Sequence, residues 1–87
     1  MPTIIGYHDV KDTDHWLASP KREEFLGPLG VTNIRLFVDP ENPTRVGGLM
    51  DVSDMDAVMT AMKTEAAAEA MASDGVLPDT LVILVEA

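Results

Sequence analysis

The first and last predicted strands of the chain are apolar on both faces. Residues 3–10 carry apolar side chains at odd and even positions, and residues 81–85 form an unbroken apolar run. The first pattern is typical of a strand in the middle of a sheet that is covered on both sides. Residues 34–38 and 45–52 also have strand patterns, and residues 39–44 join them through a polar stretch with two prolines. Because proline cannot continue a ladder, we expect an antiparallel pair with a long connection.

The first helical segment is predicted to begin after residues 12–14, whose side-chain oxygens can accept hydrogen bonds from the amides of the first turn. Its expected buried residues are Trp16 and Leu17. Proline cannot donate a backbone hydrogen bond and clashes one turn back, so we expect a break at Pro20. Ser19 is then the cap of a second piece that starts at Pro20.

The second helical segment follows residues 53–56, which form a capping box. Apolar residues then recur at helical spacing: Met55, Met59, Met62, Ala66 and Ala70. Gly75 is the expected left-handed stop of this segment. In the strand before it, Gly47 and Gly48 predict either a bulge or a close approach by a neighbour or a ligand.

The predicted element order is β-α-β-β-α-β. This is the ferredoxin-like α+β sandwich, a four-stranded antiparallel sheet with both helices on one face, in a single domain over residues 1–87. Two helices cover only one face, and the other would expose a larger apolar patch than monomers tolerate. We therefore expect a homodimer through the open sheet face, with Ile83 or Val85 facing the partner.

The composition excludes several classes of partner. The net charge is −9 with only six Lys and Arg, whereas nucleic acids and anionic membranes are bound mainly through cationic side chains. The chain has no cysteine, which removes disulfides, thiolate zinc sites and cysteine nucleophiles. The N-terminal residues do not have the pattern of a signal peptide, and no apolar run approaches the roughly 20 residues of a membrane helix. We expect a cytoplasmic protein.

Histidine is the residue type best suited to acid–base chemistry near neutral pH, and the chain has two. His8 lies near the end of the first strand, where its imidazole can serve as a catalytic base or bind a substrate oxygen. The alternative is a structural role, in which His8 supports the strand-to-helix turn by a hydrogen bond. His15 fits a solvated helix start. The two histidines have no third ligand at a suitable spacing, so we predict no metal site.

Other side chains are candidates for lining a ligand pocket. Trp16 is either a core residue or the aromatic wall of a pocket. Arg35 either pairs with Asp51 across the hairpin or anchors an acidic ligand. The full candidate ligand-binding set is His8, Trp16, Arg35, Phe37, Met50 and Met59. The sequence contains no recognisable phosphate loop, carboxylate dyad or nucleophile elbow, and it predicts no cofactor.

A series of short motifs runs in order along nearly the whole chain. These are His8-Asp9-Val10-Lys11-Asp12, Trp16, Arg35-Leu36-Phe37-Val38-Asp39-Pro40, Arg45-Val46, Val52-Ser53-Asp54-Met55, and Asp74-Gly75-Val76 with Pro78. In this arrangement the chain resembles the dimeric α/β-barrel superfamily, which includes antibiotic-biosynthesis monooxygenase-like and muconolactone-isomerase-like proteins. The resemblance implies two subunits whose sheets face each other in a shared barrel, with a pocket between helices and sheet.

The resemblance implies no single reaction, because the superfamily includes cofactor-free oxygenases, isomerases, haem-degrading enzymes and proteins without known activity. The Asn, His and Trp set of the haem-degrading branch has no counterpart here, since His8, His15 and Trp16 all fall in the first segments.

Three functions therefore stay open, and whether the protein is an enzyme is part of the question. The first is a homodimer that binds a small apolar or aromatic molecule between helices and sheet. The second is a cofactor-free monooxygenase or isomerase for an aromatic or polyketide-like substrate, with His8 as base. The third is a dimerisation module without a ligand. A cavity beside His8 would separate the first two from the third.

Overall fold

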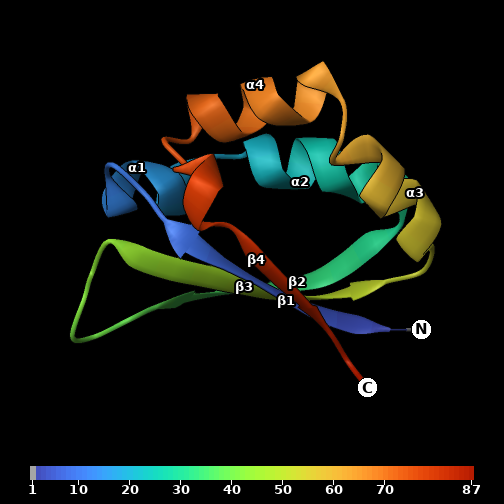
Figure 1. Ribbon diagram of the computed structural model, residues 1–87, viewed down its shortest axis with the longest axis horizontal. Helices are drawn as coiled ribbons and strands as arrows, with labels where there is room; N and C mark the ends of the chain where they lie inside the picture. The colour runs from blue at the N-terminus through green and yellow to red at the C-terminus, as the bar shows by residue number, and fades with distance from the viewer. Residues whose placement is uncertain (1) are drawn as a thin grey trace.

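The computed structural model describes residues 2–87, and its elements follow the predicted order (Figure 1). The strands are β1 (Thr3–Asp9), β2 (Val31–Val38), β3 (Arg45–Val52) and β4 (Val82–Val85). The helices are α1 (Thr13–Ala18), α2 (Lys21–Leu26), α3 (Met55–Ala61) and α4 (Glu65–Ser73), with 3-10 turns at Gly27–Leu29 and Pro78–Thr80. The ferredoxin-like α+β fold predicted from the sequence is confirmed. The first helical segment is divided into two pieces, as predicted, and the second is divided as well.

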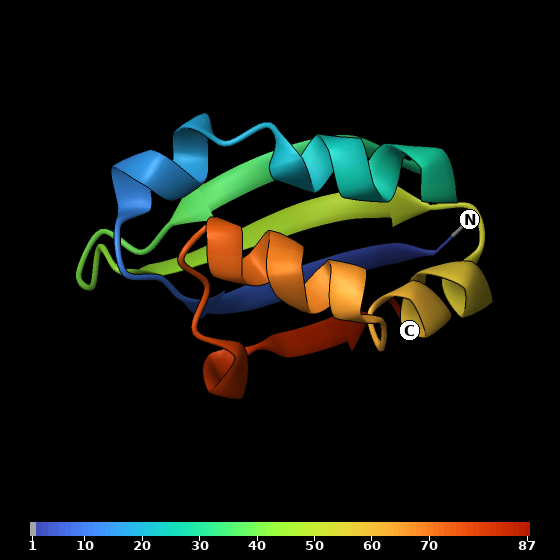
Figure 2. The same cartoon turned by 90° about the horizontal axis from the view of Figure 1, so that it is seen from above.

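The strands form one antiparallel sheet in the order β2-β3-β1-β4. The helices described within residues 2–87 all lie on one face of this sheet, as Figure 1 and Figure 2 show. β1 is central, as its two apolar faces predicted, and Gly6 lies opposite Gly48 on one side and Ile83 on the other. β4 is an edge strand.

Side chains on the helix-facing side of the sheet form the core in two clusters. The buried members of the first are Ile4, Val31, Met50, Val52 and Val58. Those of the second are Val10, Trp16, Val46 and Val76. Burying an aliphatic side chain of this size contributes about 1.5–3 kcal/mol, so these clusters hold the helices on the sheet.

The first helical segment breaks at Pro20, as predicted. Asp12 accepts a hydrogen bond from an amide in the first turn of α1, and Ser19 Oγ accepts one from the amide that follows Pro20. Trp16 is buried, also as predicted. The prediction that Leu17 is buried is wrong, because a six-residue helix presents only a narrow face to the sheet and Leu17 lies outside it, 42% exposed.

The second helical segment also breaks, which its apolar spacing did not indicate. α3 ends at Ala61, and Thr64 caps α4 by accepting a hydrogen bond from the amide of Ala67 at 3.3 Å. The restart changes which residues face the sheet, so that Val58 and Ala67 are the buried ones. Met59, expected on the buried face, is exposed. No helix within residues 2–87 has the length and apolar character needed to cross a bilayer.

The register of the sheet is irregular in β2 and not at the consecutive residues Gly47 and Gly48 of β3. The pairing shifts by one residue between Thr32 and Arg35, where Asn33 has a φ of 55°. Asparagine tolerates this left-handed conformation better than most residues, and it allows a bulge there. For Gly47 the prediction of a close approach by a neighbour is confirmed. A Cβ atom at this position would lie 3.1 Å from the backbone oxygen of Gly6.

The sheet side away from the helices exposes apolar side chains, and we call this surface the open face. Directly paired strand residues share a face, so the pairings place these apolar residues on it: Ile5, Tyr7, Phe37, Leu49, Val82 and Leu84. Phe37 and Leu84 are more than half exposed. The expectation that Ile83 or Val85 lies on this face is wrong, because Ile83 packs against the core and Val85 pairs with the buried Ile4.

Candidate functional site

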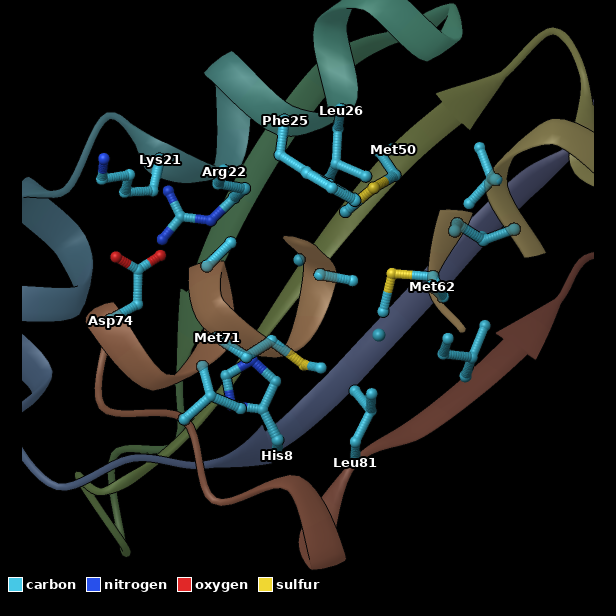
Figure 3. A pocket seen from close by; sticks show the side chains of 18 of the residues that line it. His8, Lys21, Arg22, Phe25, Leu26, Met50, Met62, Met71, Asp74 and Leu81 are labelled. Carbon is cyan, nitrogen blue, oxygen red and sulfur yellow. The ribbon is translucent and has the colours of Figure 1, made fainter. Parts of the chain in front are cut away.

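A cavity of about 130 Å³ lies between the helices and the sheet (Figure 3). Residues of α1 to α4 form its roof, and residues of β1, β3 and β4 form its base. Most of its lining is apolar, including Phe25, Leu26, Met50, Met62, Met71 and Ile83. An apolar protein cavity of about 150 Å³ is large enough to bind benzene. The space therefore suits a ligand of single-ring size.

Two glycines form the base of the cavity at its centre. Gly6 of β1 and Gly48 of β3 are directly paired, and both line the cavity. A Cβ atom on Gly6 would meet nothing within 4 Å, whereas one on Gly48 would lie 3.2 Å from Cε of Met50. The space over Gly6 is therefore open because that position carries no side chain.

Trp16 and Arg22 are stacked at one end of the cavity. The break at Pro20 ends α1 and starts α2, which lets Arg22 reach back over the indole. Its Cζ lies 4.4 Å from the centroid of the ring, a cation–π contact. Its Nη2 donates a hydrogen bond of 2.8 Å to the backbone oxygen of Trp16, which also accepts a longer one, of 3.4 Å, from the amide of Ser19 at the end of α1.

Asp74 is a buried charged residue at the same end of the cavity, only 5% exposed. It lies at the C-cap of α4, and its Oδ1 accepts a hydrogen bond from the hydroxyl of Ser19. Figure 3 shows its carboxylate and the guanidinium of Arg22 pointing toward each other. Burial lowers the pKa of Arg22, and the negative charge of Asp74 opposes that shift. The two charges therefore stabilise one another where water is partly excluded.

His8 reaches the cavity from β1, beside Trp16. The two rings meet edge to face, with centroids 5.6 Å apart and planes at 81°. Nδ1 lies 3.3 Å from the backbone oxygen of Asp9, and since a carbonyl only accepts, Nδ1 is the donor and Nε2 of the neutral ring is an acceptor. Burial lowers the pKa of His8, as does the charge of Arg22, against the raising effect of the Asp9 contact. His8 is therefore neutral at pH 7, the state in which it can accept a proton.

The structure brings together half of the predicted ligand-binding set: His8, Trp16 and Met50 line the cavity. The other half lies elsewhere. Arg35 and Phe37 are on the opposite side of the sheet, since they pair with Leu49 and Gly47. Met59 is exposed on α3 and does not line the cavity.

Arg35 and Asp51 do not form the predicted ion pair. Asp51 instead accepts hydrogen bonds from Thr3 Oγ1 at 2.8 Å and from Asn33 Nδ2 at 3.4 Å. These hydrogen bonds lower the pKa of Asp51, and the charge of Arg35 adds a smaller effect in the same direction. Arg35 therefore influences Asp51 only through its charge, away from the cavity.

Arg22 and Asp74 are the site residues that the sequence interpretation missed. The restart at Pro20 predicted a second helix, and Gly75 predicted a helix end next to Asp74, but neither signal says that the two side chains point toward each other. That arrangement depends on α2 packing against α4. Within residues 2–87, no three His, Asp or Glu side chains are grouped as a metal ion requires.

No model of a known protein family matches the sequence, and no curated protein matches it. Solved structures share its fold. A Bordetella bronchiseptica protein assigned as an antibiotic biosynthesis monooxygenase superposes with a TM-score of 0.72 at 17% identity, over 99% of this chain and 94% of that one. SnoaB, a cofactor-independent oxygenase from Streptomyces nogalater, gives 0.65 at 12% identity, over 98% and 87%. A further antibiotic biosynthesis monooxygenase gives 0.65 at 15% identity, over 100% and 97%. These similarities confirm the ferredoxin-like fold of the chain.

Proposed function

We propose that this chain is a single-domain homodimeric protein that binds a small apolar or aromatic molecule in the cavity beside His8. The observation that carries the proposal is the space itself, about 130 Å³ with a largely apolar lining. Ligand sites in proteins are typically concave and apolar, with a few polar groups that fix orientation. His8, Arg22 and Asp74 are such groups, gathered at one end of this cavity.

The size of the cavity favours a single ring over a polyketide-like molecule of several fused rings. Benzene occupies a cavity of about 150 Å³, close to the volume found here. The missing side chain at Gly6 supports this interpretation, since the backbone leaves room there for a flat molecule. A larger substrate would need the helices to move away from the sheet.

The exposed open face supports the homodimer. Its apolar residues cover adjacent strands, from Phe37 on β2 to Leu84 on β4, and both of these side chains are more than half exposed. A second copy of the same surface is the economical cover, because two-fold dimers pair one patch with itself. The partner would also make a barrel from two such sheets.

A second candidate function, a cofactor-free oxygenase or isomerase, is favoured by the state of His8. A neutral imidazole with Nδ1 donating to Asp9 presents Nε2 as a base within an apolar space. Oxygen uptake with hydroquinone as probe tests the oxygenase. If the protein is an oxygenase, the wild type should take up oxygen faster than His8→Gln, and equal rates from the two folded proteins would contradict the oxygenase.

Titration with toluene tests the proposed binding function. Toluene is expected to shift the fluorescence of Trp16, the only tryptophan, and the amide resonances of Gly48. Gly6→Val should abolish this binding, because the added side chain enters open space that the ligand needs. Gly6 does not have a positive φ, so a β-branched residue suits the strand there.

Gly27→Ala is the matched control for this experiment. A Cβ atom on Gly27 also meets nothing within 4 Å, but Gly27 does not line the cavity. The control should bind toluene like the wild type. Absence of toluene binding in the wild type would contradict the proposal and favour a dimerisation module without a ligand.

A further inference from the structure

One end of the cavity is charged, whereas the rest of its lining is apolar. Lys21 and Arg22 are two of only six Lys and Arg residues in the chain, and both line the cavity at this end. Lys21 is exposed, so this end of the cavity reaches the surface. Two cations there face one carboxylate, Asp74, beside the neutral His8. The lining therefore carries one positive charge in excess, in a chain whose net charge is −9, and the negative charge of Glu23 acts on Arg22 from outside the lining.

Arg22 has hydrogen-bond donors available for a ligand. A guanidinium carries five N–H donors, and within residues 2–87 the side chain of Arg22 makes one hydrogen bond, to the backbone oxygen of Trp16. Stacking on the indole fixes the plane of the guanidinium, so its remaining donors lie along a defined edge. Asp74 faces this group from α4, as Figure 3 shows, but a single carboxylate does not use all of its donors.

We propose that the ligand of this cavity is a single-ring aromatic anion, whose carboxylate or phenolate oxygen is bound by Arg22 and Lys21 while its ring lies over Gly6. The inference rests on the proposed function and adds the chemical class of the ligand. Charge-assisted hydrogen bonds from a guanidinium are among the strongest in proteins. A protein of net charge −9 repels anions over most of its surface, so the attraction must come from these local cations.

Three probes of the same ring size test the charge preference: benzoate, toluene and benzylamine. Isothermal titration at neutral pH is expected to give benzoate a dissociation constant at least about tenfold lower than that of toluene, because hydrogen bonds to charged groups are worth this much. Benzylamine should bind more weakly than toluene. Added salt should weaken benzoate binding through Lys21, which is exposed, and leave toluene binding unchanged.

Variants then locate the attraction at the two cations. Lys21 is exposed, so the Lys21→Gln variant should stay folded. It should weaken the binding of benzoate severalfold without affecting the binding of toluene. The double variant Arg22→Gln/Asp74→Asn replaces the charged pair by amides, which avoids an unpaired buried carboxylate. It should weaken benzoate binding at least about tenfold more than it weakens toluene binding. Lys63→Gln removes the same charge away from the cavity and is the matched control.

The outcomes separate this inference from the proposed function. Toluene binding with no preference for benzoate over benzylamine overturns the anion proposal and leaves the binding function standing. An equal loss of benzoate affinity in Lys63→Gln and Lys21→Gln also overturns it, because net charge alone would then explain the effect. Failure of all three probes to bind contradicts the binding function itself.

Discussion

His8 meets Trp16 edge to face, with ring centroids 5.6 Å apart, while Arg22 covers the indole with its Cζ 4.4 Å from the ring centroid. Three side chains from β1, α1 and α2 thus pack against one another, with the indole in the middle. A proton added to His8 would place a second cation near Arg22 in a partly dehydrated space. The neutral form of His8 is therefore the one that this packing stabilises.

The first prediction concerns the pH dependence of folding. Since burial lowers the pKa of His8 in the folded state, the unfolded chain binds a proton more readily below about pH 6.5. The contribution of His8 to the free energy of unfolding should therefore stay constant above about pH 6.5. It should fall as the pH is lowered toward about 5. Urea unfolding followed by Trp16 fluorescence at several pH values measures it.

His8→Gln should remove this part of the pH dependence. His15→Gln, which changes the other histidine of the chain, is the control and should keep it. The same slope between pH 5 and 7 in His8→Gln and in the wild type would contradict the prediction, since the carboxylates are common to both proteins.

The second prediction separates the two faces of β4. Leu84→Asp puts a charge on the open face, where it should give a folded monomer at concentrations at which we expect the wild type to be a dimer. Ile83→Asp places the charge against the core and should unfold the chain, at a cost of about 3–5 kcal/mol. Sedimentation and circular dichroism distinguish these results. A wild type that is monomeric at high concentration would refute the dimer.

The third prediction concerns the link between the α1–α2 break and the end of α4. Ser19→Ala removes the hydroxyl that donates to Asp74, and leaves a buried carboxylate with one partner fewer. The loss should be about 1–3 kcal/mol of unfolding free energy. In a double-mutant cycle with Asp74→Asn, the two effects should be less than additive by about 1 kcal/mol. Ser73→Ala, next to Asp74 on α4, is the control, and additive effects would argue against the link.

The fourth prediction uses the backbone of β2. Asn33 has a φ of 55°, which costs a β-branched residue about 1–2 kcal/mol. Asn33→Val should therefore lower the melting temperature, whereas Asn33→Gly should not lower it to the same extent. Both variants lose the contact with Asp51, so the difference between them reports the backbone alone. Equal melting temperatures would show that the bulge moves or straightens.

The strands and their order were predictable because each strand carries its own pattern. Residues 45–52 were predicted as a strand with the bounds that the structure has for β3. The break at Pro20 was predictable for a covalent reason, the missing amide hydrogen. Thr64 was a weaker signal for a helix break, since the apolar residues on either side of it fit one continuous helix. Only packing on the sheet shows that the helix restarts there.

Candidate site residues were harder to predict than the fold. His8 and Trp16 were chosen as candidates because their residue types are rare in this chain and suited to a pocket, and both line the cavity. Phe37 and Arg35 were assigned to the wrong side of the sheet, because the sequence shows alternation but does not say which parity faces the helices. Arg22 and Asp74 meet only through the docking of α2 beside α4, which local patterns do not encode.

The roof over the cavity is assembled from helices of six to nine residues. Segments this short do not persist as helices in water by themselves, so each one depends on its contact with the strands. Hydrogen exchange should then be faster for their amides than for those of β1 and β3. Brief detachment of one such helix would widen the opening that the cavity already has beside Lys21, and the exchange rate of a bound ligand would then depend on the rate of this local opening.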